Sequence, residues 1–211
     1  MNNNQAVYRV NLKNNKKWIA LTFDIGNGSK VPLPVIKILK KEQVDKATFF
    51  LSGTWARHYP EIARQVKYSG YEVGSHGYLH ENYTEQTNKW IKKQSIKAEH
   101  ALISTLGVHP RLIRTPNGDW NQRVVKTLKS RGYTTIQWSI DSLDWMKPGV
   151  KKIINNATAR TKPGDIILLH ASDTASQTPK ALSTIIRILR AKGYEFVTVS
   201  ELLKAGSPGV C

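Results

Sequence analysis

The stretch Trp18-Ile-Ala-Leu-Thr-Phe-Asp-Ile-Gly26 decides the fold, because an apolar and β-branched run leads directly into a carboxylate and a glycine. Such a run predicts a buried strand over Trp18–Phe23, and Asp24 then lies where that strand meets the following loop. Six more runs of the same kind follow, and longer helical patterns separate them. This alternation predicts a parallel α/β architecture, either an open sheet or a closed barrel.

The chain is expected to form a single domain, because no Pro/Gly/Ser linker, internal repeat or low-complexity tract divides it. We expect a lead-in over residues 1–17, the domain over residues 18–204 and a flexible tail over residues 205–211. The predicted strands are Trp18–Phe23, Ala47–Leu51, Tyr71–Ser75, Arg111–Arg114, Thr134–Ser139, Asp165–His170 and Glu195–Val199. The predicted helices are Leu33–Glu42, Pro60–Ser69, Thr87–Leu106, Asn121–Ser130, Val150–Thr161 and Pro179–Ala191.

Chemically active side chains cluster at the predicted strand ends, where parallel α/β folds place their functional residues. Five of the seven strand ends present a carboxylate, an imidazole or a guanidinium, and a random scatter would not place all of them on one rim. The five segments are Thr22-Phe-Asp-Ile-Gly26, Ser75-His-Gly-Tyr-Leu-His80, Arg114-Thr-Pro-Asn-Gly118, Asp141-Ser-Leu-Asp-Trp145 and Leu168-Leu-His170.

Each of these residues, taken alone, has a structural explanation. Asp24 is equally suited to capping a turn. His76 and His80 are spaced by one helical turn, so both imidazoles can reach one cation, but isolated pairs of this kind are often accidental. His170 closes a strongly apolar strand, as a hydrogen-bonded core histidine would. Only the five segments together predict an active site.

The composition excludes several classes of protein. The chain is 40% hydrophobic and 22% charged, which is typical of a folded globular domain. No apolar run approaches the ~18–20 residues that a membrane-spanning helix needs. The first residues, Met1-Asn-Asn-Asn-Gln5, lack the layout of a signal peptide. Cys211 is the single cysteine, which excludes an internal disulfide scaffold and a zinc ribbon.

The net charge is strongly positive, with 32 Lys and Arg against 15 Asp and Glu, a balance of +17. Such a charge favours polyanionic partners, either nucleic acid or an anionic cell-wall polymer. The basic residues are spread along the chain, and no zinc-finger spacing, RNA-binding aromatic pattern or basic region before heptads is present. We therefore expect no nucleic-acid partner.

The five segments, in this order and spacing, resemble the five motifs of the polysaccharide deacetylases, the NodB-homology domain of carbohydrate esterase family 4. The resemblance runs from about Trp18 to about Leu203 and implies a distorted seven-stranded (β/α) barrel. It is closest to the spore-associated PdaB-type branch. The stretches that carry this closer likeness are Thr48-Phe-Phe-Leu-Ser52, Gly74-Ser-His-Gly77, Gln137-Trp-Ser139 and Asp165-Ile-Ile-Leu-Leu-His-Ala-Ser172.

The resemblance implies hydrolysis of an N-acetyl group on an amino sugar. His76 and His80 would hold a divalent metal, zinc by expectation, that polarises the acetamide carbonyl and acidifies a bound water. Asp24 would be the general base for that water. His170 would be the general acid that protonates the departing amine.

Four more residues would support this chemistry in the family. Arg114 would keep Asp24 ionised, and Asp144 would favour the imidazolium form of His170. The backbone N–H of Asn117 would bind the oxyanion. Leu168 and Trp145 would form the apolar pocket for the acetyl methyl group.

Two motifs depart from the family pattern. Active members usually carry a second acid, a metal ligand, where this chain has Ile25, and two imidazoles are fewer than the three protein ligands typical of catalytic zinc. Water, or a side chain such as Asn27, would have to complete the site, so the metal would be held weakly or not at all. An Asp-Ile pair resembles a feature of the PdaB-type branch. Thr115 and Asn117 stand where Pro and Tyr are common, which leaves substrate preference open.

The expected function is metal-dependent deacetylation of a cell-wall polysaccharide of the peptidoglycan type, linked to sporulation. The alternative is a weak or inactive relative that binds wall glycan, because of Ile25. The expected partner is an N-acetylated cell-wall glycan, and the expected state is a monomer. We expect an exported protein of a Gram-positive spore former, located in the cell wall, associated with the spore, or anchored to the membrane by a removed N-terminal segment.

Overall fold

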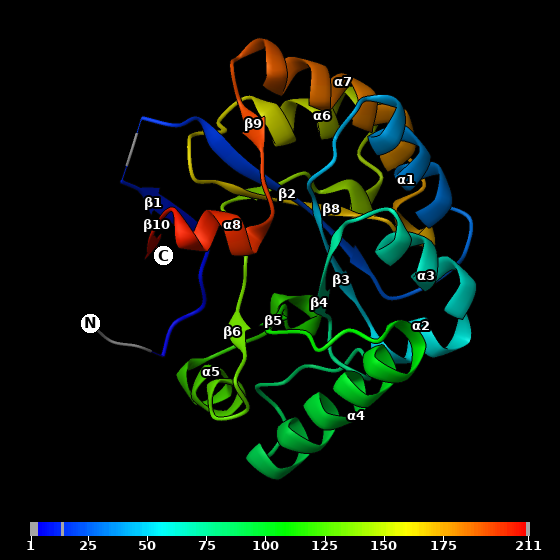
Figure 1. The fold of residues 1–211 in the computed structure, drawn as a ribbon, viewed down its shortest axis with the longest axis vertical. Helices are drawn as coiled ribbons and strands as arrows, with labels where there is room; N and C mark the ends of the chain where they lie inside the picture. The colour runs from blue at the N-terminus through cyan, green and yellow to red at the C-terminus, as the bar shows by residue number, and fades with distance from the viewer. Residues whose placement is uncertain (1–3, 14, 210–211) are drawn as a thin grey trace.

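Strand β2 (Trp18–Ile25) lies at the centre of the sheet, and every residue from Ile19 to Ile25 is buried. It pairs in parallel with β3 (Thr48–Leu51) on one side and with β8 (Ile166–His170) on the other. The structure, a computed structural model, describes residues 4–13 and 15–209 (Figure 1).

Within the described residues, seven parallel strands follow the order β6-β5-β4-β3-β2-β8-β7, and β9 pairs with the start of β2. The strands at the two edges of the sheet, β6 and β7, are consecutive in the chain. The sheet therefore curls, so that the short segment joining β6 to β7 contacts both edges. The Ile136 N–H donates to Ile113, and the Ser139 N–H donates to Ile166. This confirms the predicted α/β domain with a distorted seven-stranded barrel. The remaining strands are β4 (Glu72–Ser75), β5 (Leu112–Ile113), β6 (Thr134–Thr135), β7 (Ile140–Asp141) and β9 (Glu195–Phe196).

Helices cover the outside of the curl (Figure 1). In the part of the chain that the structure describes, none of them is long and apolar enough to cross a membrane. The helices are α1 (Pro32–Lys41), α2 (Gly53–His58), α3 (Pro60–Tyr68), α4 (Asn88–Leu106), α5 (Gln122–Lys129), α6 (Val150–Thr158), α7 (Thr178–Ala191) and α8 (Val199–Lys204). Three short 3-10 turns, η1 (Pro116–Gly118), η2 (Asp144–Met146) and η3 (Asp173–Ala175), follow strand ends.

Alternation along β2 separates the apolar layer from the site. Leu21, Phe23 and Ile25 belong to the main apolar cluster beneath the outer helices. Thr22 and Asp24 point to the inside of the curl, because successive strand side chains face opposite sides of a sheet. The sheet therefore delivers Asp24 to an enclosed space and buries Ile25 on the other side.

Two predicted strands differ in the structure. The run Thr134–Ser139 forms β6 and then bends, because its first residues pair with β5 while the chain crosses to β8. The run Glu195–Val199 ends as a strand at Phe196, since Thr198 caps α8 and the Glu201 side chain returns to the Thr198 N–H. This reciprocal capping box outweighs the β-branched composition of the segment.

The predicted flexible tail is wrong for residues 206–209. Strand β10 (Gly206–Gly209) pairs antiparallel with β1 (Arg9–Leu12), which lies in the predicted lead-in. Residues 8–13 alternate apolar and polar side chains, as a strand does, whereas Gly206–Gly209 has no strand pattern and acquires its structure from the backbone groups of β1. Residues 210–211, including Cys211, lie outside the described part of the chain.

The junction between β1 and the sheet predicts an unusual sensitivity at Gly164. The Val10 N–H donates to the Gly164 carbonyl, and a Cβ at Gly164 would lie 1.8 Å from the Val10 oxygen. Gly70 has a similar positive φ, 82° against 86°, but a Cβ added there would meet nothing within 4 Å. Gly70→Ala should cost about 1–2 kcal/mol of unfolding free energy from backbone strain alone. Gly164→Ala should cost roughly 1–3 kcal/mol more through overlap.

Urea unfolding of both variants checks this expectation. Equal losses for Gly164→Ala and Gly70→Ala would contradict the close approach of β1 to the sheet.

Candidate active site

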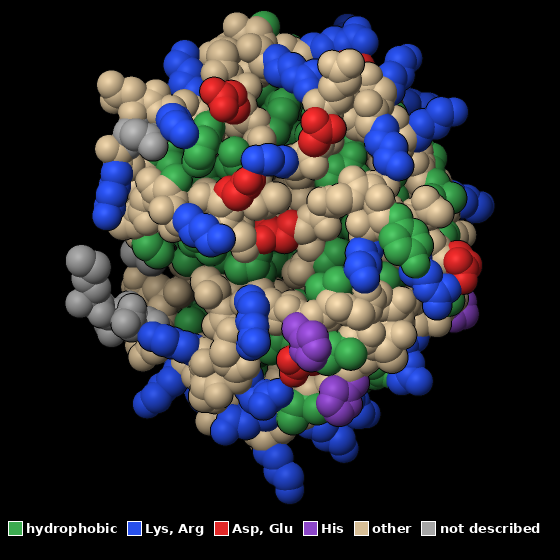
Figure 2. All heavy atoms as spheres, viewed as in Figure 1, with side chains coloured by type: hydrophobic (Ala, Val, Ile, Leu, Met, Phe, Trp, Pro, Cys, Tyr) green, Lys and Arg blue, Asp and Glu red, His purple; other side chains and the backbone are tan. Residues whose placement is uncertain are grey.

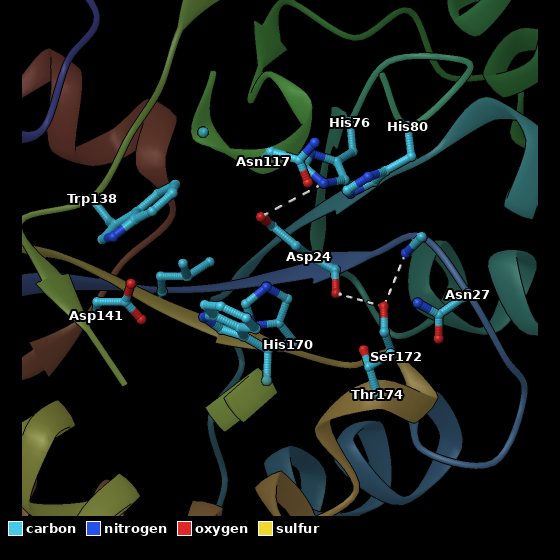
Figure 3. Close-up of a pocket in the computed structure, with 14 residues that line it drawn as sticks. Asp24, Asn27, His76, His80, Asn117, Trp138, Asp141, His170, Ser172 and Thr174 are labelled. Carbon is cyan, nitrogen blue, oxygen red and sulfur yellow. Dashed lines mark hydrogen bonds and ion pairs between the residues drawn. The ribbon is translucent and has the colours of Figure 1, made fainter. Parts of the chain in front are cut away.

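The carboxyl ends of the strands enclose a cavity of about 400 Å³ on the inside of the curl (Figure 3). Seven of the nine predicted site residues line it, namely Asp24, His76, His80, Asn117, Trp145, Leu168 and His170. The other two, Arg114 and Asp144, are fully buried behind the wall and contact Asp24 and His170. The structure thus brings together all five sequence segments.

Asp24 is held by a buried guanidinium. One Arg114 N–H donates to Asp24 Oδ1 at 2.7 Å, and Arg114 also donates to Thr22 Oγ1 and to the Gln137 carbonyl, each at 3.0 Å. Burial alone would raise the pKa of Asp24, but the nearby positive charge, that of Arg114 above all, outweighs it and lowers that pKa. Asp24 is therefore a carboxylate at neutral pH, ready to accept a proton.

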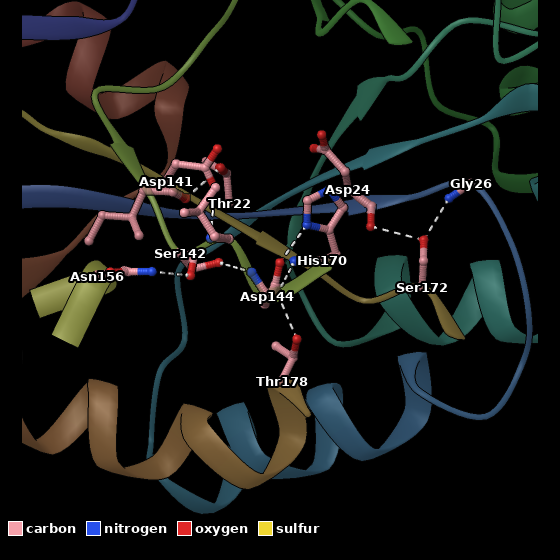
Figure 4. Close-up of polar contacts among 12 residues, drawn as sticks. Thr22, Asp24, Gly26, Asp141, Ser142, Asp144, Asn156, His170, Ser172 and Thr178 are labelled. Carbon is pink, nitrogen blue, oxygen red and sulfur yellow. Dashed lines mark hydrogen bonds and ion pairs between the residues drawn. The ribbon is translucent and has the colours of Figure 1, made fainter. Parts of the chain in front are cut away.

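His170 has the opposite electrostatic environment (Figure 4). Its Nδ1 lies 2.7 Å from Asp144 Oδ1, and Asp144 Oδ2 accepts from the His170 backbone N–H and from the Thr178 hydroxyl. Burial would lower the pKa of His170, yet the hydrogen bond and negative charge of Asp144, with smaller contributions from Asp24 and Asp141, raise it. With Nδ1 engaged by Asp144, Nε2 is the ring nitrogen left for the cavity.

Asp24 and His170 are direct partners in the β2–β8 register, so a proton acceptor and a proton donor stand side by side on neighbouring strands. Ser172 joins the segments that follow them. The Gly26 N–H donates to Ser172 Oγ at 3.0 Å, and that hydroxyl donates to the Asp24 carbonyl at 3.3 Å. The spacing between the two groups is therefore set by backbone pairing.

The two imidazoles, four residues apart, lie in a loop and not on a helix. The chain leaves β4 at Ser75 and turns through Gly77, whose φ is +73°. The rings of His76 and His80 still lie edge to face, with centroids 5.3 Å apart. Loop geometry, which the spacing did not reveal, brings them together.

His76 is a neutral imidazole. Its Nδ1 lies 2.9 Å from the Arg114 carbonyl, so this nitrogen carries the hydrogen, and Nε2 lies 3.9 Å from Asp24 Oδ2. Burial lowers the pKa of His76 to about 4, more than the Asp24 carboxylate raises it. A neutral ring with an unprotonated Nε2 beside a carboxylate has the form of a metal ligand.

The fit to a divalent metal is incomplete. Ile25 is fully buried in the apolar layer and contributes nothing to the cavity. Across residues 4–13 and 15–209, no three His, Cys, Asp or Glu side chains are grouped so as to hold a metal ion. Asn27 lines the cavity from the loop after Gly26. The cavity thus provides two imidazoles, and the other ligands of an ion would have to come from Asn27 or water.

The predicted substrate contacts also lie at the cavity. Asn117 has a left-handed backbone, with φ of 58°, and its side-chain amide donates to Asn82 Oδ1 at 2.8 Å. Leu168 is buried in the wall, whereas Trp145 is half exposed at the rim. The two surround part of the same space, an arrangement consistent with an apolar contact for a small group.

Asp141 and Trp138 line the cavity but were not singled out from the sequence. Asp141 Oδ1 accepts from the Leu143 N–H at 2.8 Å, and burial, with the Asp144 charge, raises the pKa of Asp141. Trp138 lies against Arg114, with 5.4 Å from the guanidinium carbon to the ring centroid. Asp141 begins the segment that follows the fifth predicted strand, and this strand-end position could have identified it as a site residue.

Asp173 is a third residue that the sequence did not single out. Its carboxylate accepts from the backbone N–H groups of Ser29, Lys30 and Val31, at 3.2, 2.8 and 2.9 Å. Gly28 passes so close that a Cβ there would lie 2.0 Å from Asp173 Cγ. Asp173 thus fixes the loop that follows Asp24 and carries Asn27.

One cavity of the curled parallel sheet thus holds a carboxylate of lowered pKa, a histidine of raised pKa and a pair of imidazoles. The family model described as polysaccharide deacetylase matches residues 11–136. A peptidoglycan-N-acetylglucosamine deacetylase of Bacillus cereus is 37% identical over 194 residues, covering 90% of each chain. The chain therefore belongs to the polysaccharide deacetylases, the NodB-homology domain of carbohydrate esterase family 4.

Solved structures support the same membership. A peptidoglycan N-acetylglucosamine deacetylase structure superposes with a TM-score of 0.88 at 30% identity, covering 96% of this chain and 94% of that one. A pseudoenzyme of carbohydrate esterase family 4 from Bacillus anthracis superposes with a TM-score of 0.87 at 30% identity, covering 95% of this chain and 69% of that one. The fold is thus similar both to a deacetylase and to a pseudoenzyme.

The contact between Asp144 and His170 predicts a measurable shift. Asp144→Asn removes the negative charge, so the pKa of His170 should fall below its value in the unsubstituted protein. NMR titration of the His170 ring checks this, and Asp45→Asn, which removes an exposed carboxylate elsewhere, is the matched control. An unchanged His170 titration in Asp144→Asn would contradict the assignment of Asp144 as its electrostatic partner.

Proposed function

We propose that this protein hydrolyses N-acetyl groups on amino-sugar units of a cell-wall glycan of the peptidoglycan type, with a divalent metal. One observation carries the proposal: Asp24 and His170 face one cavity in opposite protonation states. Their pKa values are shifted apart, downward for Asp24 and upward for His170. Separated acid and base pKa values are what hydrolysis of an amide at neutral pH requires.

The proton transfers can be assigned to named atoms. Asp24 accepts a proton from water as the water oxygen bonds to the acetamide carbon. The C–N bond then breaks, and Nε2 of His170 delivers a proton to the nitrogen that leaves. Acetic acid and a free sugar amine result, with Asp24 left protonated and His170 left neutral, so atoms and charges balance. Arg114 holds Asp24 ionised before the step, and Asp144 stabilises the imidazolium before its proton is given up.

His76 and His80 would hold the metal, zinc by proposal, whose chemistry when bound is polarisation of the carbonyl and acidification of water. The neutral state of His76 supports this role, because protonated imidazole cannot ligate. Leu168 and Trp145 would contact the acetyl methyl group, and the backbone of Asn117 would face the developing oxyanion. The left-handed turn at Asn117 supports that orientation role, since it gives this residue a fixed backbone position.

The setting of the proposal is the wall of a Gram-positive cell. A net charge of +17 suits a protein that works among anionic wall polymers. We further propose membership of the PdaB-type branch, a link to sporulation, export and a monomeric state, on the motif resemblance and the Asp24–Ile25 pair.

A second candidate function is glycan binding with little or no turnover. Ile25 favours it, because the position that carries a metal-ligating acid in active members is occupied here by an isoleucine that packs into the apolar layer. The likeness to a pseudoenzyme of the same fold is consistent with it. Retention of two contacting pairs, Asp24 with Arg114 and His170 with Asp144, favours turnover, since a binding module needs no proton relay.

Acetate release tests the proposed reaction. N-acetylglucosamine oligomers and peptidoglycan should release acetate when zinc or cobalt is added and not with chelator. Asp24→Asn should lower the rate by about 10²- to 10⁴-fold, because the general base is lost while shape is kept. Folding of the variant is checked by its thermal unfolding.

The two candidate functions predict different results. If neither substrate releases acetate at any metal concentration, while glycan binding persists with equal affinity in Asp24→Asn, the protein is a wall-binding relative and deacetylation is abandoned.

Restoring a carboxylate tests the metal site. Ile25→Asp should raise zinc affinity by at least about tenfold, seen as a larger zinc-dependent rise in unfolding temperature, because a ligand that binds only the folded state stabilises it. Ile25→Asn is the matched control, because an asparagine side chain has the size of an aspartate side chain and carries no charge. Both substitutions bury polarity and should lower stability without zinc. Equal zinc stabilisation of the two variants would show that the carboxylate does not reach the ion.

A further inference from the structure

Helices α1, α6 and α7 pack against one another on one side of the sheet, with α7 between the other two (Figure 1). The three helices contain no Asp, no Glu and no aromatic residue. Figure 2 shows Lys and Arg side chains along the upper right edge of the molecule, where Figure 1 places these helices. The three helices themselves therefore contribute cations and no anions, and the carboxylate of Glu42, at the end of α1, is paired with Arg187.

Two cations on these helices are already engaged. Arg187 binds Glu42 through two hydrogen bonds, at 3.1 and 2.8 Å, and Arg190 donates to the Gln43 carbonyl at 2.7 Å. The remaining six side chains are all lysines and are all exposed. Among the described residues they have no hydrogen-bond or ion-pair partner. We call these six the basic face: Lys37, Lys40, Lys41, Lys151, Lys152 and Lys180.

The placement of three of these lysines is unfavourable for the isolated protein. Lys151 and Lys152 lie in the first turn of α6, and Lys180 lies in the first turn of α7. The positive end of a helix dipole disfavours cations there, by about 0.3–1 kcal/mol each at an exposed position. No acidic residue occupies the first turn of either helix to offset this. An external anion would relieve the repulsion.

We propose that the basic face binds a phosphodiester-linked polyol polymer of the cell wall. Separate lysines spread over three helices suit a flexible chain with repeated negative charges, because each ammonium acts as a point charge toward phosphate. Nucleic acid fits less well, since the face lacks free Arg forks and aromatic platforms for reading or stacking bases. The wall setting rests on the proposed function, whereas the binding test below does not depend on catalysis.

The experiment measures binding of purified poly(glycerol phosphate) over a range of salt concentrations. The test variant is Lys37→Gln/Lys151→Gln/Lys180→Gln, which removes one charge from each helix. The control variant is Lys89→Gln/Lys92→Gln/Lys93→Gln, which removes three exposed charges from α4, on another side of the molecule (Figure 1). Thermal unfolding establishes that both variants are folded, and acetate release from short oligomers is followed separately.

We expect the test variant to bind about tenfold more weakly and its salt slope to fall by about 2, close to 0.7 for each lost phosphate contact. The control variant should bind as the unsubstituted protein does. Equal weakening by the two variants, or no binding at all, would overturn the proposal. Equal or tighter binding of duplex DNA, lost in the same test variant, would replace the wall polymer with nucleic acid. If the unsubstituted protein binds poly(glycerol phosphate) but releases no acetate from the oligomers, the proposed function is rejected and the basic face is retained.

Discussion

The buried contact between Arg114 and Asp24 is the constraint on which the interior of this protein depends. The guanidinium is fully buried, and it reaches Asp24 and Thr22 on β2 and the carbonyl of Gln137 on the segment between β6 and β7. Phe50 covers it, with its ring centroid 4.3 Å from the guanidinium carbon. Removing one partner from a buried pair of this kind costs roughly 3–5 kcal/mol, because the other charge is left unpaired. A hydrocarbon interior would be simpler to fold, but it would leave no ionised base in the cavity.

The contact with Arg114 lowers the pKa of Asp24, whereas the contact with Asp144 raises the pKa of His170. The pKa of Asp24 is lowered on folding, so its stabilising contribution is present above its unfolded value and is lost as pH falls through the folded value. The pKa of His170 is raised, so its contribution is present below about 6.5 and is lost as pH rises through the folded value. Both contributions are fully present only in the window between these limits. The same window contains ionised Asp24 and protonated His170, the states that the proposed reaction requires.

Position 25 shows how one residue can serve the fold and limit the site. Alternation along β2 directs Asp24 into the cavity and Ile25 into the main apolar cluster. A carboxylate there would have to leave apolar surroundings to reach the imidazoles, whereas isoleucine gains the burial of its side chain, about 2–3 kcal/mol. The cavity holds Asp24, His170 and the two imidazoles, while the second acid of the family pattern is absent. Under the proposed function, metal affinity, more than proton transfer, is the property that Ile25 affects.

Particular residues show how far sequence reasoning reached. The strand at Trp18–Phe23 and the run of strands and helices after it could be predicted, because apolar periodicity is a local property. The nine candidate site residues came from the strand ends and the family resemblance, and they lie in or directly behind one cavity. The pairing of β10 with β1 could not be predicted, since β10, which consists of two glycines, a serine and a proline, has no strand pattern without its partner. The bend between β6 and β7 was missed because it depends on two edges of the sheet at once. Asp173 was missed because its role lies in three backbone N–H groups distant in sequence. The sequence by itself determined the parallel α/β class, the cluster of acids and imidazoles and the excess positive charge. Only the tertiary structure decided the distances at which Arg114 meets Asp24 and Asp144 meets His170, and the burial of Ile25 in the apolar layer, because those facts depend on contacts between segments far apart in the chain.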